Sequence, residues 1–210
     1  MRFLLYCFLA VLLSPTGAFV VRNPPATTSL SAMKRPLLDQ LATTLFNLEN
    51  ARVQASSEID EQGRKGEPMA WSEKDSWANR FSEIMATAGY GLKQWVADFV
   101  AGDYDREQVE KIIQDLVQTN EIAMFSFTTC PFCRRAKDYL DQRGLAYTAL
   151  EVDQHPMGNQ IRAVLGQQTK RTSMPAIFIR QTFIGGCNDG PGLLTLAESG
   201  ELERLLAPEK

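Results

Sequence analysis

The sequence predicts an α/β domain in the C-terminal part of the chain, preceded by an all-α region. Between residues 37 and 119, apolar side chains recur at spacings of three and four, which is the period of amphipathic helices. After Asn120, short apolar runs typical of strands alternate with helical patterns, and the last two runs flank a turn at Arg180 and Gln181. We therefore expect three parts: a leader over residues 1–36, a helical extension over 37–119 and the α/β domain over 120–210.

Composition and charge argue against some classes of partner. The 210 residues are 44% hydrophobic and 22% charged, as in an ordinary globular protein, and the formal net charge is −3. A slightly acidic chain gives no general reason to expect nucleic acid or an anionic membrane as a partner. After the leader, no apolar run is long enough to span a bilayer. We expect no nucleic-acid partner, and no membrane contact in the mature form.

The leader has two sections of different composition. Arg2 is followed by an apolar block over residues 3–13, and Thr16 and Ala18 are small residues suited to a cleavage site, as in a signal peptide. Residues 19–36 contain no acid but several basic and hydroxyl residues, as in a transit peptide. The combination resembles the two-part plastid leader of algae whose plastids lie inside extra membranes. It predicts plastid localisation, with the secretory pathway as the alternative.

Four helices are expected in the extension. The first begins near Pro36, and the polar, glycine-containing residues 56–68 predict a loop. Ser72 is expected to cap the second helix, and Asp105, with Gln108 three residues later, the fourth. Aromatic residues at helical spacing are expected to lie in the core. The apolar positions are Leu38, Leu41, Leu45 and Leu48; Trp77, Phe81, Ile84 and Met85; Leu92, Trp95, Val96, Phe99 and Val100; and Val109, Ile112, Ile113, Leu116 and Val117.

Cys130 and Cys133 allow three interpretations: a metal site, a structural disulfide or a redox pair. A zinc site needs a second pair of ligands, but Cys187 and His155 stand apart from each other in the sequence. A structural disulfide between residues three apart would close a very small loop and remove little unfolded-state entropy. The remaining interpretation is redox chemistry.

The residues around the pair predict different roles for the two thiols. The strand ends before Thr128, and Pro131 suits the first position of a helix, so Cys130 is expected at the helix N-terminus. There the backbone N–H groups and the helix dipole stabilise a thiolate and lower its pKa, and two arginines at 134 and 135 add positive charge. Cys133 lies one turn further on and is expected to attack a mixed disulfide formed at Cys130.

Three motifs together resemble the glutaredoxin family. They are CPFC at residues 130–133, RTSMP at 171–175 and IGGCNDG at 184–190, and they occur in the family's order. The resemblance covers roughly residues 120–207 and does not include the helical extension. It implies a thioredoxin-like fold with a four-stranded mixed sheet flanked by helices. It also implies that glutathione is the reductant.

The resemblance further implies a glutathione-binding groove. Pro175 is expected to follow a cis bond, and Met174, at a position usually held by valine, to pair with the glutathione backbone as an added strand would. Asn188 and Asp189 would hold the γ-glutamyl end. Arg162 would bind the glycine carboxylate, with a solvated helix arginine as the alternative. The full set of glutathione-binding residues implied by the resemblance is Arg162, Ser173, Met174, Pro175, Gly186, Cys187, Asn188 and Asp189.

Three further residues are expected near the groove: Phe127, Phe132 and Cys187. Phe127 replaces a lysine that many glutaredoxins carry, and Phe132 replaces the commoner tyrosine, so one charge and one hydroxyl are missing near the thiol. Cys187 is expected to be a small packing residue, with a regulatory thiol as the alternative.

The predicted function is glutathione-dependent thiol–disulfide exchange. Cys130 and Cys133 would reduce protein–glutathione mixed disulfides and protein disulfides, so glutathione and such client proteins are the expected partners. The alternative, also from the resemblance, is a [2Fe–2S] cluster carrier in which Cys130 of each of two subunits and two glutathiones hold the cluster. Pro131 favours the enzyme, because cluster-binding relatives more often have glycine or serine there. For the role of the helical extension there are three alternatives: docking of clients, oligomerisation, or covering one face of the domain.

Overall fold

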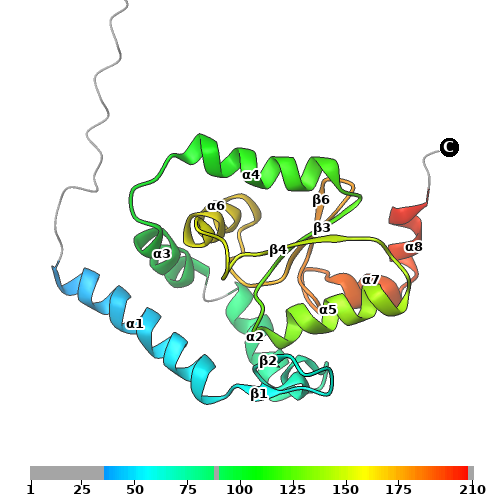
Figure 1. Ribbon diagram of the computed structural model, residues 1–210, viewed down its shortest axis with the longest axis horizontal. Helices are drawn as coiled ribbons and strands as arrows, with labels where there is room; N and C mark the ends of the chain where they lie inside the picture. The colour runs from blue at the N-terminus through cyan, green and yellow to red at the C-terminus, as the bar shows by residue number, and fades with distance from the viewer. Residues whose placement is uncertain (1–35, 88–89, 208–210) are drawn as a thin grey trace, which may run out of the picture. The chain divides into compact units, whose positions relative to one another are not determined.

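The computed structural model describes residues 36–87 and 90–207, which form one compact unit (Figure 1). The predictions for the leader fall on residues 1–36, of which only the last is described, so they stay predictions. Microscopy of a fluorescent protein fused behind residues 1–36 would test them. No helix within the described ranges is long and apolar enough to cross a membrane.

The α/β domain contains the predicted mixed four-stranded sheet. Its strands are β3 (Ile122–Ser126), β4 (Thr148–Glu151), β5 (Ala176–Ile179) and β6 (Thr182–Gly185), in the order β4-β3-β5-β6. β3 pairs in parallel with β4 and antiparallel with β5, and β6 is antiparallel to β5. All five residues of β3 are buried, as expected for a central strand covered on both faces. The thioredoxin-like fold class is therefore confirmed.

Helices cover both faces of this sheet (Figure 1). They are α4 (Arg106–Thr119), α5 (Pro131–Gln142), α6 (Gly158–Thr169), α7 (Leu193–Glu198) and α8 (Glu201–Leu206). Alternate side chains of a strand point to opposite faces. Accordingly, Ala123 and Phe125 share a core with α4 and α6, whereas Ile122 and Met124 share another with α5, α7 and α8. The core of the domain thus includes α4, which precedes the predicted boundary at residue 120.

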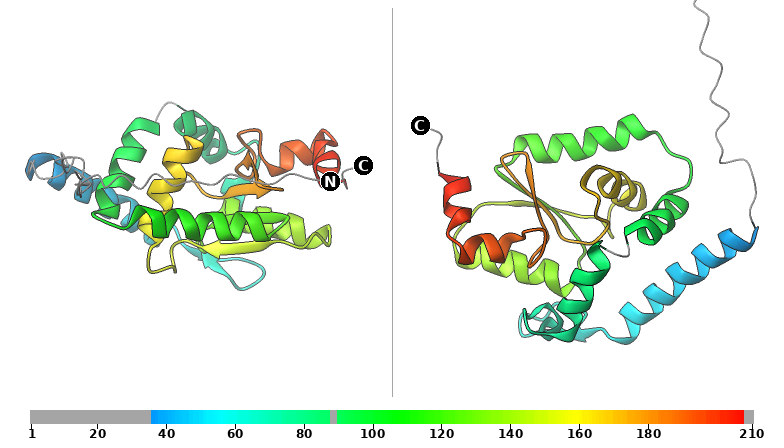
Figure 2. Two further views of the ribbon diagram at one scale, coloured as in Figure 1. Left: turned by 90° about the horizontal axis from the view of Figure 1, so that it is seen from above. Right: turned by 180° about the vertical axis from the view of Figure 1, so that it is seen from behind.

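The N-terminal region is mostly helical, as predicted, but it contains a short hairpin. Its elements before α4 are α1 (Pro36–Ala55), β1 (Glu58–Ile59), β2 (Lys65–Gly66), the 3-10 helix η2 (Met69–Ser72), α2 (Trp77–Thr87) and α3 (Tyr90–Ala101). The expected loop at residues 56–68 holds the antiparallel pair β1–β2. Its turn is closed by Asp60, which accepts from the Arg64 N–H at 2.8 Å. In Figure 2, α1 lies at one end of the described chain and α7–α8 at the other.

Two details of the helical extension differ from the sequence prediction, and one agrees with it. Asp105 caps α4 as expected, accepting from the Gln108 N–H at 3.2 Å. The cap of α2 is Ser76, whose Oγ accepts from the Asn79 N–H at 2.9 Å, so Ser72 as the cap was wrong. Trp77, Phe81 and Phe99 are 68%, 59% and 36% exposed, so the prediction that these aromatic residues lie in the core was also wrong. For Trp77 and Phe81 the reason is that α2 turns a polar residue, Asn79, toward the domain.

Candidate active site

Cys130 lies at the N-terminus of α5, as the sequence predicts. It is the N-cap residue with extended backbone angles (φ −79°, ψ 122°), and Pro131 begins the helix. The preceding turn is fixed by the Thr128 N–H, which donates to both carboxylate oxygens of Asp153 at 3.1 Å. The Cys130 sulfur therefore stands where the unpaired N–H groups of the first helical turn favour negative charge.

The two thiols have opposite environments. Cys133 is fully buried and Cys130 is only partly buried, and both are free thiols. A hydrogen bond from the Cys133 thiol lowers the pKa of Cys130; burial opposes this, and the backbone N–H groups of Cys133 and Phe132 support it. Burial, and then the neighbouring Cys130 sulfur, raises the pKa of Cys133 well above its ordinary value. The thiol that ionises more easily is therefore the more accessible one.

A second wall of the site is the segment before β5. The Met174–Pro175 bond is cis, which confirms the expectation for Pro175. The Met174 carbonyl lies 3.6 Å from the Cys130 sulfur and accepts its S–H. Within the described ranges the Met174 N–H makes no hydrogen bond. This segment consequently offers a backbone N–H and C=O directly beside the thiol.

A third wall is the turn after β6, where two glycines allow close packing. Gly185 has a φ of 104°, and a Cβ on Gly186 would lie 2.6 Å from Asp189 Oδ1. The Asp189 carboxylate forms an ion pair with Arg171, whose Nη2 also donates to Ser173 Oγ at 3.2 Å. The sequence prediction missed Arg171 as a partner of Asp189, although Arg171 is the first residue of the RTSMP motif.

Comparison with known proteins places this geometry in a family. The family model Glutaredoxin matches residues 122–184. Glutaredoxin-2 of Schizosaccharomyces pombe is 37% identical over 98 residues, which are 47% of this chain and 86% of that protein. The chain belongs to the glutaredoxin family. Glutaredoxin-1 of Rhizophagus irregularis is 33% identical over 100 residues, covering 48% of this chain and 96% of that protein.

A solved structure resembles the same part of the chain. The crystal structure of a buckwheat glutaredoxin–glutathione complex is 34% identical, covers 48% of this chain and 89% of that chain, and has a TM-score of 0.46. Members of the glutaredoxin family are glutathione-dependent thiol oxidoreductases, and this chain is an oxidoreductase of that family. The family model does not reach the N-terminal region, whose contacts with the glutaredoxin site are described below.

Arg162 and Cys187 complete the set of predicted site residues. Arg162 on α6 donates from Nε to the Thr172 carbonyl at 3.1 Å, and its guanidinium lies over the Phe127 ring, 5.5 Å from the centroid. Cys187 is buried in the core beside α7, and burial raises the pKa of its thiol to about 12. The prediction that Cys187 packs in the core is confirmed, and its thiol does not ionise near neutral pH.

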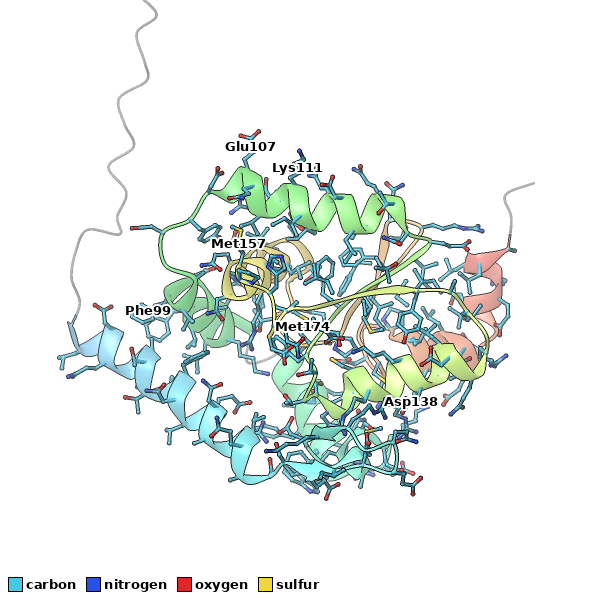
Figure 3. All side chains as sticks on the ribbon, viewed as in Figure 1. Phe99, Glu107, Lys111, Asp138, Met157 and Met174 are labelled. Atoms are coloured by element: carbon cyan, nitrogen blue, oxygen red, sulfur yellow. The ribbon has the colours of Figure 1, made fainter. Side chains whose placement is uncertain are left out.

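Residues 56–79 of the N-terminal region, here called the arm, pack directly against the glutaredoxin site. The Glu67 N–H donates to the Thr129 carbonyl at 2.9 Å, one residue before the Cys130 thiol. A Cβ on Gly66 would lie 2.6 Å from the same carbonyl oxygen, so only glycine fits at that position. The Arg64 guanidinium pairs with Asp138 of α5, labelled in Figure 3, at 2.7 and 2.9 Å.

The strongest anchor of the arm is Arg134. This arginine is only 2% exposed and donates to Asp60 Oδ2 at 2.8 Å and to the carbonyls of Arg64 and Glu67. The expectation that Arg134 adds positive charge to the thiol is thus corrected: its guanidinium is held by the arm. Burial acts to raise the pKa of Asp60, but hydrogen bonds from Arg64 and Arg134 outweigh it and lower that pKa.

The arm also reaches the opposite wall of the site. The Asn188 side-chain amide donates to the Ser72 carbonyl at 3.0 Å and to Asn79 Oδ1 at 2.9 Å, and all three residues are buried. Both amide hydrogens of Asn188 are therefore used within the protein. No sequence signal pointed to Asp60, Gly66 or Asn79, because each recognises a residue far away in the chain.

Glu67 brings a negative charge to the thiol. Its carboxylate pairs with Arg52 at 2.7 Å; burial raises the pKa of Glu67, and Arg52 opposes this. The Glu67 charge in turn acts to raise the pKa of Cys130. We expect Glu67→Gln to lower the pKa of the Cys130 thiol, so that alkylation by iodoacetamide persists to lower pH. The pH profile of alkylation measures this shift.

The control for this prediction is Glu61→Gln, which removes an exposed carboxylate of the same arm. Glu61 is not among the charges that act on Cys130, so its replacement should leave the profile unchanged. An unchanged or raised pKa in Glu67→Gln would contradict the prediction.

Proposed function

We propose that the protein reduces protein–glutathione mixed disulfides, and protein disulfides, through Cys130 and Cys133 with glutathione as the reductant. The observation that carries the proposal is the unequal thiol pair. Cys130 is accessible at a helix N-terminus with a lowered pKa, whereas Cys133 is buried with a raised one. A thiolate is the attacking species in disulfide exchange, which assigns the first step to Cys130.

With a mixed disulfide, the Cys130 thiolate attacks the glutathione sulfur. A disulfide forms between Cys130 and glutathione, the client's S–S bond breaks, and the client sulfur leaves as a thiolate that takes up a proton. The thiolate of a second glutathione then attacks the bound glutathione sulfur, which releases the Cys130 thiolate and oxidised glutathione. With a protein disulfide, the Cys130 thiolate attacks one client sulfur, and the other client sulfur leaves as a thiolate that takes up a proton. Cys133 then loses its proton and attacks the Cys130 sulfur, so that the client's second sulfur leaves and a Cys130–Cys133 disulfide remains. Two glutathiones reduce this disulfide and leave as oxidised glutathione.

The walls around the thiol support glutathione as the ligand. The Met174 N–H and C=O are oriented beside Cys130 and can pair with a peptide backbone. At one end, Arg162 offers a guanidinium to a carboxylate. At the other end, Asp189 can accept hydrogen bonds from an ammonium group. Asn188 can donate to the ligand only through its backbone N–H, because both hydrogens of its side-chain amide are bonded to Ser72 and Asn79.

The test is glutathione-dependent reduction of a small mixed disulfide, coupled to NADPH through glutathione reductase. We expect turnover that is saturable in glutathione, together with a colourless preparation. An inactive protein whose anaerobic spectrum shows visible cluster absorption would instead support the [2Fe–2S] carrier with Cys130 as a ligand.

A further inference from the structure

The cations near the site differ in whether they form an ion pair. Among the described lysine and arginine residues that are at least partly shielded from solvent, only Lys93 and Arg162 form no ion pair. Arg171, the third cation of this part of the site, is paired with Asp189. Shielding an unpaired cation from water is unfavourable unless an anion binds there. Lys93 and Arg162 therefore offer two positive charges to a negative group.

Lys93 and Arg162 are brought together by the packing of α3 on α6. Gln94, next to Lys93, donates from Nε2 to the carbonyl of Ala163, next to Arg162, at 3.0 Å. At the N-terminus of α3, the Tyr90 hydroxyl donates to the Gly166 carbonyl of α6 at 3.1 Å. The two helices pack closely at Gly166, because a Cβ there would lie 2.1 Å from Gln94 Oε1. The packing of α3 on α6 therefore brings the chain around Lys93 close to the chain around Arg162.

The charges around Lys93 come from both ends of the groove. Burial, and then the charge of Arg162, lowers the pKa of Lys93; Arg171 acts in the same direction, whereas Glu49 and Asp189 act to raise it. Glu49 on α1 is an opposing charge that acts on both Lys93 and Arg162, but its carboxylate pairs with Arg52, with Nη2 and Oε1 2.9 Å apart. Positive charge dominates at this end of the groove.

The cation pair lies where a peptide bound at the thiol would end. Arg162 is bonded to the Thr172 carbonyl, two residues before Met174, which contacts the Cys130 sulfur. An extended residue spans about 3.3–3.6 Å. A tripeptide whose central cysteine pairs with Met174 thus places its terminal carboxylate about one residue away, toward Thr172 and Arg162.

We propose that Lys93 is a glutathione-binding residue that, together with Arg162, binds the glycine carboxylate of glutathione. The inference rests on the proposed function, because it assigns one residue to the same groove. Its consequence is that the N-terminal region, which the family model does not cover, supplies part of the substrate site. Lys93 touches the ligand and takes no part in the sulfur chemistry, so it affects binding and not the exchange step.

The test replaces Lys93 by glutamine, with Lys111→Gln as the matched control. Lys111 is exposed, forms no ion pair with any described residue, and extends outward from α4 in Figure 3. Both variants remove one positive charge. We expect Lys93→Gln to raise the KM for glutathione, and the Kd for S-methylglutathione measured by calorimetry, by about 3- to 10-fold with unchanged kcat. Lys93→Arg should keep both constants within about twofold, since it keeps the charge.

A second ligand identifies the carboxylate. With glutathione amide, whose glycine carboxylate is blocked, wild type and Lys93→Gln should bind equally. The inference is overturned if wild type is active but Lys93→Gln behaves like Lys111→Gln, or if the loss is as large with the amide as with the acid. A wild-type protein that neither binds glutathione nor turns over the mixed disulfide would overturn the proposed function itself, and the role of Lys93 with it.

Discussion

Replacing Cys130 by serine should lower kcat/KM for glutathione-dependent reduction of both mixed disulfides and protein disulfides by several orders of magnitude. A serine hydroxyl does not ionise near neutral pH, and it cannot form the mixed disulfide with glutathione. The comparison is Cys133→Ser, which removes the buried thiol and leaves the attacking one. Initial rates on a glutathionylated peptide and on a protein disulfide, measured for both variants, test the assignment.

The two substrates should separate the two thiols. We expect Cys133→Ser to retain reduction of the mixed disulfide and to lose most reduction of the protein disulfide, because only the latter needs the second attack. Full loss of both activities in Cys133→Ser, with activity retained in Cys130→Ser, would reverse the roles.

Replacing Arg134 by methionine should lower the free energy of unfolding by about 3–5 kcal/mol, because removal of one partner leaves a buried charge and buried carbonyls unpaired. The Arg134 and Asp60 side chains are 2% and 4% exposed, so water cannot take the place of the lost partner. The variant should release the arm from α5 and uncover the turn before Cys130. Urea unfolding gives the change in stability, and the alkylation rate of Cys130 gives its accessibility.

The neighbouring Arg135 provides the control. Its side chain is 33% exposed and its contact with Glu73 is long, at 3.9 Å, so Arg135→Met should cost less than about 1 kcal/mol. Equal stability of the two variants would contradict the anchoring role of Arg134. A stable Arg134→Met variant with faster alkylation of Cys130 would separate the effect on the arm from the effect on the domain.

The sequence correctly predicted the features that depend only on residues close together in the chain. Pro131 after Cys130 predicts the helix start, and Asp105 with Gln108 predicts a cap, because capping depends on residues within one turn. The cis bond at Pro175 followed from the motif around it. Helical periodicity also located α2, but it shows only that Trp77 and Phe81 share a face. Whether another element covers that face depends on packing that periodicity does not contain.

The remainder of the site depends on pairs that are distant in the chain. Arg134 appeared as a charge near the thiol because its neighbours in sequence are Cys133 and Arg135, whereas its partner Asp60 is 74 positions away. In the same way, nothing near Asn188 indicates that its amide is bonded to Ser72 and Asn79. No sequence pattern indicates the role proposed for Lys93 either, because its place near Arg162 depends on the packing of α3 on α6.

The arm has a consequence for the order in which the chain folds during synthesis. It leaves the ribosome early, yet Asp60 pairs with a residue 74 positions later and Asn79 with one 109 positions later. Contacts between such distant segments close only after both have been made. The arm therefore cannot take its final place until translation has passed Asn188, near the end of the α/β domain. A nascent chain halted before that residue has its reactive cysteines but an arm attached at only one end.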